Sequence, residues 1–174
     1  MNTLAYKIAL MIKRANPEQT HSVEVMNYAL GIILNTMFII VISGLIGLIT
    51  GAWHETMLFL CAFSILRLCS GGFHMKTARA CNVISILLCT ITPYFSSLLD
   101  ETVFGINLFC LTAMILFAPQ PDIHSQIPKK LYPTLKILSV LLVGSNFVLN
   151  SSVIGLAFLA QSLTVIFAKR EERS

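Results

Sequence analysis

The sequence predicts an all-α integral membrane protein with about six transmembrane helices, and three observations lead to this fold class. Of its 174 residues 56% are hydrophobic and only 11% are charged, whereas an average soluble domain carries about a quarter charged residues. The mean hydropathy is +0.80, and the apolar residues gather in runs close to the ~20 residues that a helix needs to cross ~30 Å of hydrocarbon. Positive and negative side chains fall in alternate connections between these runs. The bilayer is therefore the expected solvent.

The first 26 residues are expected to form an amphipathic, cytoplasmic N-terminal region. Leu4, Ile8, Met11 and Ile12 recur at helical spacing, with cationic partners between and after them. Such a pattern suits a short helix lying in the headgroup layer. The segment 16–19, Asn-Pro-Glu-Gln, then has the composition of a helix start, so the first membrane span is expected to begin there as a cytoplasmic extension.

Five apolar blocks follow, and the last is long enough for two spans. The expected spans are residues 27–50, 53–69, 80–99, 102–118 and the two halves of 131–168, which fold about a polar turn at 150–152. Residues 119–136 hold four prolines and are expected to form a stiff, non-helical loop rich in proline and lysine. No repeat is visible, so residues 1–174 are interpreted as one integral-membrane domain.

The distribution of charged residues predicts how these spans are oriented in the membrane. In a six-span topology all twelve cations lie on one side, and Glu55, Asp100 and Glu101 lie on the other. The positive-inside rule then places both termini and both basic loops in the cytoplasm.

The five cysteines do not predict a disulfide framework, because their number is odd and most stand inside apolar runs. Cys61, Cys89 and Cys110 are expected to be small buried side chains of the helix bundle. Cys81 is different, because it follows a polar corner that begins at Arg67.

The corner, residues 67–81, is expected to hold the catalytic loop and the start of the third span. Only eleven residues separate Glu55 from Arg67, which as a helix cover about half of the hydrocarbon thickness. The loop after Arg67 should thus lie near the cytoplasmic lipid boundary, where non-helical backbone needs a cover of protein or a water-filled pocket. Gly71 and Gly72 suit such a tight, covered turn.

His74 and Cys81 are a candidate catalytic pair in this corner. An imidazole can take the proton of a thiol and later protonate a leaving amine. A third span that begins near residue 77 or 78 would place Cys81 close to the positive end of the helix dipole. Seven residues of continuous helix would separate the pair by ~10.5 Å, so His74 must fold back from the loop. Two alternatives stay open at this point: a solvated loop with Cys81 packed in the bundle, and a metal site formed with Cys69.

The pattern Arg67-x-x-Ser70-Gly71-Gly72-x-His74, with Cys81 seven positions later, resembles the signature of the accessory gene regulator protein B (AgrB) family. The segments 117–119 and 128–130, the charged tail, the length and the six-span pattern are similar to that family as well. Met75 is a departure, since family members usually have alanine after the histidine.

The resemblance implies a membrane-embedded cysteine endopeptidase of quorum sensing in the bacterial cell membrane, with its active site at the cytoplasmic face. Cys81 would be the nucleophile, and His74 the general base and acid. The substrate would be an AgrD-like precursor peptide, cleaved before its acidic C-terminal tail and cyclised through an acyl-thioester to a thiolactone or lactone. The family also suggests a homodimer surrounded by membrane lipids. No cofactor, metal ion or nucleic acid is expected.

Other residues of the motif and loops have less defined roles. Candidate contacts with substrate or an oxyanion are Arg67, Ser70, Gly71, Gly72, Lys129 and Lys130. Snorkelling of the arginine, capping by the serine and positive-inside anchoring by the lysines are the alternatives. Asp122 and His124 could orient His74, or belong to a solvated loop. For the whole chain, the rival functions are a small membrane peptide transporter and a non-catalytic membrane scaffold.

Overall fold

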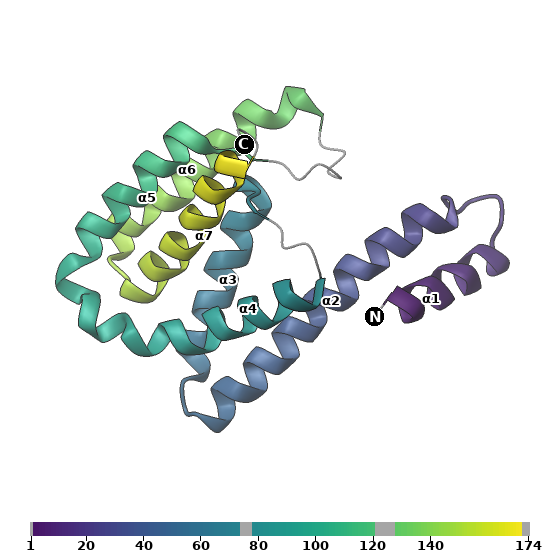
Figure 1. The fold of residues 1–174 in the computed structure, drawn as a ribbon, viewed down its shortest axis with the longest axis horizontal. Coiled ribbons are helices and arrows are strands. Elements are labelled where there is room, and N and C mark those ends of the chain that lie inside the picture. The colour runs from purple at the N-terminus through teal and green to yellow at the C-terminus, as the bar shows by residue number, and fades with distance from the viewer. Residues whose placement is uncertain (1, 74–77, 121–127, 172–174) are drawn as a thin grey trace. The chain divides into compact units, whose positions relative to one another are not determined.

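The computed structural model describes residues 2–73, 78–120 and 128–171, and these residues are almost entirely helical (Figure 1). Apart from one isolated parallel bridge between Gly71 and Gln120, this part of the chain contains no β-structure. The elements are α1 (Asn2–Ala15), α2 (Val23–Ile49), α3 (Trp53–Ser70), α4 (Ala78–Ile91), the 3-10 helix η1 (Thr92–Thr102), α5 (Val103–Phe117), the 3-10 helix η2 (Lys129–Leu131), α6 (Tyr132–Leu149) and α7 (Ser152–Glu171). The predicted all-α class is confirmed for the described residues.

The chain divides into two compact units, Met1–Ile42 and Ser43–Ser174. In the first unit, α1 confirms the predicted N-terminal helix, and Leu4 and Met11 are exposed apolar side chains on it. The prediction that a helix starts at Asn16 is wrong. The Asn16 side chain does accept a hydrogen bond from the Gln19 amide at 3.4 Å, but the chain only turns there, and α2 begins at Val23. An Asn cap bonds a local turn as readily as a helix.

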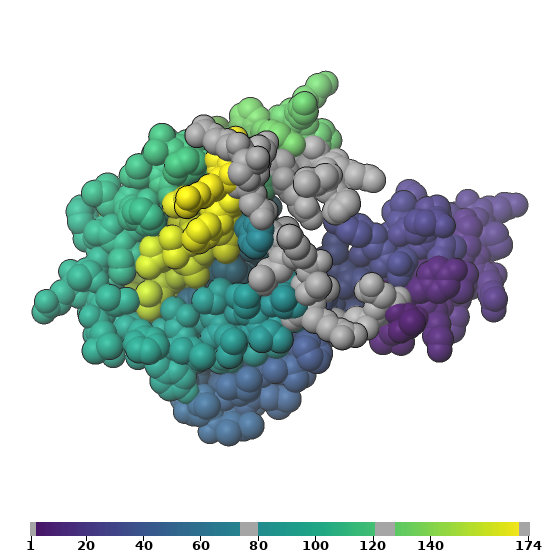
Figure 2. All heavy atoms as spheres, in the orientation of Figure 1, coloured from purple at the N-terminus to yellow at the C-terminus, as the bar shows by residue number. Residues whose placement is uncertain are grey.

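In the second unit, α7 is the central helix and packs against α3 and α5, while α6 packs against α5 and α3 (Figure 1). Side chains from all four helices meet in one apolar core. Its buried members are Leu66, Cys110, Met114, Ala118, Val143, Phe158 and Val165. Figure 2 shows that part of α7, drawn in yellow, also reaches the surface of this unit. The end of α3 and the middle of α7 are thus held side by side.

The outer surface of the helices is apolar, which is the reverse of a soluble domain. Leu68, Leu98, Phe104 and Val148 are among the most exposed side chains, at 77%, 75%, 68% and 88%. Soluble monomers rarely expose such contiguous apolar area. Four helical stretches are long and apolar enough to cross a membrane: Val23–Ile49, Ala80–Phe117, Lys129–Leu149 and Ser152–Arg170. The chain therefore has the character of a multi-span membrane protein.

The six expected spans fall on the helices α2–α7, but the described residues form four stretches able to cross a membrane, so the number six stays a prediction. The expected spans 80–99 and 102–118 are joined by η1 into one 38-residue helical stretch. The 18-residue helix α3 is not among the four apolar stretches, because charged and polar side chains occupy both of its ends. The polar turn between the last two spans is confirmed: Asn150 adopts a left-handed φ of 47° and ends α6.

The expected non-helical loop 119–136 is shorter than predicted. Tyr132 begins α6, and Pro133 stands in its first turn, where a missing N–H costs nothing because that group has no partner within the helix. Lys129 and Lys130 form η2 directly before it. Residues 121–127, which include Asp122 and His124, lie outside the described residues.

Candidate active site

The candidate site begins where α3 ends. The Gly71 amide donates to the Arg67 carbonyl at 2.9 Å and closes the helix, and the chain then leaves through two residues with positive φ, 67° at Gly71 and 131° at Gly72. A Cβ atom at Gly72 would lie 2.6 Å from Thr164 Oγ1 and 3.2 Å from Gln161 Nε2. Both the backbone angle and the lack of space therefore require glycine at this position.

Backbone hydrogen bonds to two other parts of the chain, Gln120 after α5 and Thr164 of α7, hold the segment 71–73. The Gln120 amide donates to the Ser70 carbonyl at 2.8 Å, and the Gly72 amide donates back to the Gln120 carbonyl at 2.9 Å. One residue later, the Phe73 amide donates to the Thr164 carbonyl of α7 at 3.0 Å. Buried backbone groups away from water need partners of this kind. The expectation that protein covers the double-glycine turn is confirmed.

Gln161 belongs to this site and was not predicted from the sequence. It is 0% exposed in the middle of α7, and its Nε2 donates to Ser70 Oγ at 2.9 Å and to the Gly71 carbonyl. Its Oε1 accepts from Thr164 Oγ1 at 3.1 Å and from Arg67 Nη1 at 3.4 Å. The available signal was a long uncharged amide in an apolar helix, because a polar side chain in such a place has to find partners.

Arg67 is turned towards its own loop. Its Nη2 donates to the Phe73 carbonyl at 2.9 Å, and its guanidinium carbon lies 5.8 Å from the centre of the Phe63 ring. A cation over an aromatic face is favourable, more so away from water. These contacts are made to protein groups, and contact of Arg67 with a substrate stays a prediction. They make Arg67 a clamp on the segment that follows α3.

Ser70 is fully buried and serves the same turn. Its hydroxyl donates to the Leu66 carbonyl at 2.8 Å while it accepts from Gln161. This geometry agrees with the capping alternative. The structure thus brings together Arg67, Ser70, Gly71 and Gly72, four residues of the predicted motif.

Cys81 is the fourth residue of α4, which begins at Ala78, and it is half-buried. Residues 74–77, directly before α4, lie outside the described residues, so the prediction that Cys81 stands in the first turn of this helix stays a prediction. His74 and Lys76 lie outside the described residues, as does the side chain of Arg79, so the predicted pairing of His74 with Cys81 stays a prediction.

The other cysteines and the two lysines are placed as follows. Cys69, Cys89 and Cys110 are buried, and all five cysteines are free. The expectation of burial is wrong for Cys61, which is exposed on α3, because the outer apolar face of that helix is uncovered. The candidate metal site formed by Cys69, His74 and Cys81 includes His74 and so extends beyond the described residues.

Lys129 and Lys130 are exposed on η2, where both are accessible to a partner.

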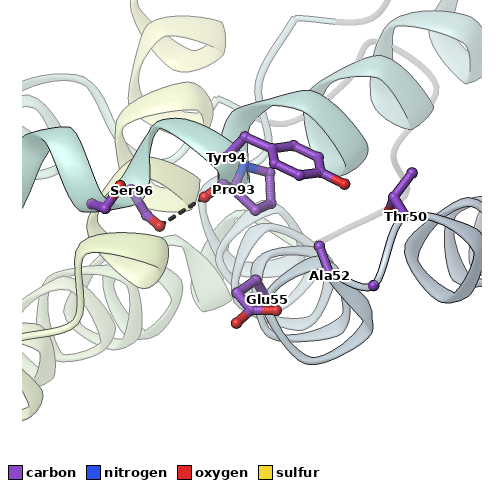
Figure 3. Close-up of a pocket in the computed structure, with 8 residues that line it drawn as sticks. Thr50, Ala52, Glu55, Pro93, Tyr94 and Ser96 are labelled. Carbon is purple, nitrogen blue, oxygen red and sulfur yellow. Dashed lines mark hydrogen bonds between the residues drawn. The ribbon is translucent and has the colours of Figure 1, made fainter.

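An open cavity of about 260 Å³ lies at the other end of α3 (Figure 3). Glu55, Pro93 and Tyr94 contribute to its lining, together with the turn between α2 and α3. The Ser96 hydroxyl is turned to the Pro93 carbonyl at 2.7 Å. Arg67 stands twelve positions after Glu55 on α3, about 18 Å along the axis. This cavity is therefore separate from the candidate active site.

The fold and the site define a helical membrane protein with a half-buried cysteine near the described start of α4, preceded in sequence by a double-glycine turn that packs against α7. The sequence matches the family model described as accessory gene regulator B over residues 5–168, and the chain belongs to this family. It is 33% identical over 93 residues to a putative AgrB-like protein of Halalkalibacterium halodurans, covering 52% of this chain and 46% of that protein. It is 24% identical over 133 residues to accessory gene regulator protein B of Staphylococcus aureus, covering 75% of this chain and 71% of the relative. The chain spans about half the length of the first of these relatives. No solved structure matches it.

Proposed function

We propose that this protein is a membrane-embedded cysteine endopeptidase that removes the C-terminal tail of a small quorum-sensing precursor peptide and permits its cyclisation. Membership of the accessory gene regulator B family supports a role in quorum sensing at a membrane. The observation that carries the chemistry is the position of Cys81, a half-buried free thiol near the described start of α4. A half-buried side chain can be reached by a substrate, and a cysteine sulfur is a strong nucleophile as its thiolate.

The first half-reaction is acyl transfer to the enzyme. The Cys81 thiolate attacks the carbonyl of the scissile peptide bond and forms a C–S bond. The C–N bond then breaks, and the leaving amine of the tail takes a proton from the His74 imidazolium. The acidic tail departs, and the precursor remains bound through an acyl-thioester.

The second half-reaction closes the ring. A cysteine thiol within the precursor (or a serine hydroxyl) gives its proton to neutral His74 and attacks the thioester carbonyl. A new C–S or C–O bond forms, the bond to Cys81 breaks, and the thiolate is restored. Thiolactone formation exchanges one thioester for another, so water must be kept from the intermediate. A site at the lipid boundary with an apolar exterior favours this exclusion.

The exposed lysines near the start of α6 would attract a precursor peptide with an acidic tail. Lys129 and Lys130 are exposed at the start of α6, and in the predicted topology they face the cytoplasm with the other cations. Clustered positive charge accelerates the arrival of an acidic peptide, and the effect falls as salt rises. The recognised partner would thus be an AgrD-like peptide at the inner face of the bacterial membrane.

Co-expression tests this function. The chain is expressed with a candidate precursor peptide that has a central cysteine and an acidic C-terminal tail, and the products are sized by mass spectrometry. We expect cleavage and a ring product with the wild type, and none with Cys81→Ala or His74→Ala at equal membrane insertion. Cys89→Ala is the matched control, because it removes a buried thiol two turns further along α4. Full processing by Cys81→Ala would refute the peptidase; a transporter or scaffold has no need of that thiol.

A further inference from the structure

The carboxamide of Gln161 is held in a single orientation. It has two N–H donors and two acceptor positions. Within the described residues Nε2 faces Ser70 and Gly71, and Oε1 faces Arg67 and Thr164, whose single hydroxyl proton is shared with the Gln161 backbone carbonyl. The Ser70 hydroxyl uses its proton on the Leu66 carbonyl, so it can only accept from the amide. Exchanging the oxygen and nitrogen of the carboxamide would therefore set its oxygen against the Gly71 carbonyl, two acceptors, and its nitrogen against the Arg67 guanidinium, two donors.

This side chain controls both ends of the segment that follows α3. It binds the Gly71 carbonyl directly, and it binds the guanidinium of Arg67, whose other nitrogen binds the Phe73 carbonyl. The neighbouring turn of α7 holds the Phe73 amide. Residue 74 follows Phe73 in the sequence. Gln161, 87 positions away from His74, therefore fixes the point from which the chain continues to the proposed base.

We propose that Gln161 is a positioning residue for the reaction, acting through the 71–73 segment on the histidine that follows it. This inference rests on the proposed function. Proton transfer requires heavy atoms within about 2.6–3.2 Å of each other, and a displacement of about 1 Å can lower the rate about 100-fold. A side chain that anchors the loop from a separate helix supplies that accuracy without touching the substrate.

The test compares Gln161→Leu with Asn146→Leu. Asn146 is an equally buried carboxamide, 0% exposed, that bonds Asn107 and Ser151 instead. Ser151 directly precedes α7 and stands ten positions before Gln161, about 15 Å along the helix axis. Each variant is purified in nanodiscs, its folded amount is measured by size-exclusion chromatography, and its cleavage of the candidate precursor peptide is measured. We expect kcat to fall about 100-fold in Gln161→Leu with KM unchanged, and kcat per folded molecule to stay at the wild-type value in Asn146→Leu.

A second readout does not depend on the precursor. Iodoacetamide labelling of each cysteine is followed by peptide mapping between about pH 5 and 9. In the wild type Cys81 should react fastest, and in Gln161→Leu its rate at neutral pH should fall about tenfold towards that of an ordinary thiol. Asn146→Leu should leave the Cys81 profile unchanged. If Gln161 contributed only to stability, the pH dependence of Cys81 labelling would be the same in folded Gln161→Leu as in the wild type.

The outcomes separate the two proposals. Wild-type kcat and an unchanged Cys81 profile in folded Gln161→Leu would overturn the role of Gln161 and leave the peptidase standing. Processing by Cys81→Ala would overturn the peptidase, and the Gln161 inference with it. Should Gln161→Leu fail to fold, Ser70→Ala is the milder variant, because it removes only one of the four partners of the Gln161 carboxamide. A several-fold fall in kcat in Ser70→Ala supports the inference, and a wild-type kcat contradicts it.

Discussion

Gly72 offers the sharpest quantitative test of the packing between the loop and α7. Its φ of 131° is unfavourable for any residue with a side chain, and holding one there costs about 1–3 kcal/mol. In Gly72→Ala the new Cβ would also lie 2.6 Å from Thr164 Oγ1. Thr164 is β-branched and has few other rotamers, so the contact must be relieved by breaking its hydrogen bond to Gln161, worth about 1 kcal/mol. We expect a total loss of about 2–4 kcal/mol.

Two other glycines separate the contributions of strain and space. Gly51 has a φ of 74°, but a Cβ added there would meet nothing within 4 Å, so Gly51→Ala should cost only about 1 kcal/mol of strain. Gly105 has open space and ordinary helical geometry in α5, so Gly105→Ala should stabilise by up to about 1 kcal/mol. The free energy of unfolding is measured by far-UV circular dichroism during SDS titration in mixed micelles.

The double variant Gly72→Ala with Thr164→Ala tests the cause. Removing the threonine hydroxyl removes the 2.6 Å contact but not the backbone strain. The double variant should therefore lose less stability than the sum of the two single variants, by about 1 kcal/mol. Strict additivity, or a Gly72→Ala protein as stable as Gly51→Ala, would show that the loop does not pack on α7 in this way.

Three further outcomes follow from the described contacts. Asn146→Leu should lower the free energy of unfolding by about 1–3 kcal/mol. The loss should exceed that in Asn107→Leu, because the Asn146 side chain bonds Asn107 and also both backbone groups of Ser151. The SDS titration described above compares the two variants. Lys129→Glu should raise KM for the acidic precursor at low salt and much less at high salt, whereas Arg170→Glu, an equal change on an exposed residue of α7, should have the smaller effect. A membrane-impermeant maleimide should label Glu101→Cys in intact cells and Lys129→Cys only after permeabilisation; the opposite pattern would invert the topology.

The bounds of α3 and the end of α6 could be predicted closely because they depend on local composition. The expected span 53–69 is α3 over residues 53–70, and the turn after α6 falls at the expected Asn150. An apolar run bounded by turn residues contains this information in consecutive positions. The 3-10 helix η1 could not be predicted, since its residues continue the apolar run of α4 and apolar composition alone does not distinguish a 3-10 helix from an α-helix.

The site could be predicted only as far as its residues are neighbours in sequence. Arg67, Gly71 and Cys81 stand within fifteen positions, so their types and spacing were informative. Gln161 contacts Ser70 across 91 positions, and a single amide in an apolar helix does not indicate its partners. Such a long-range hydrogen bond becomes visible only when α3 and α7 are packed together.

The motif therefore contains two kinds of residues with different physical tasks. Within the described part of the chain, Arg67, Ser70, Gly71 and Gly72 use their hydrogen bonds and backbone angles to form the turn itself, while Cys81 stands on a separate helix. Changing a residue of the first kind alters the path of the backbone, so its loss of activity should be accompanied by a loss of stability. Changing Cys81, a half-buried side chain, should abolish the proposed chemistry at nearly unchanged stability. Measuring both quantities for the same variants distinguishes the residues that shape the loop from those that react.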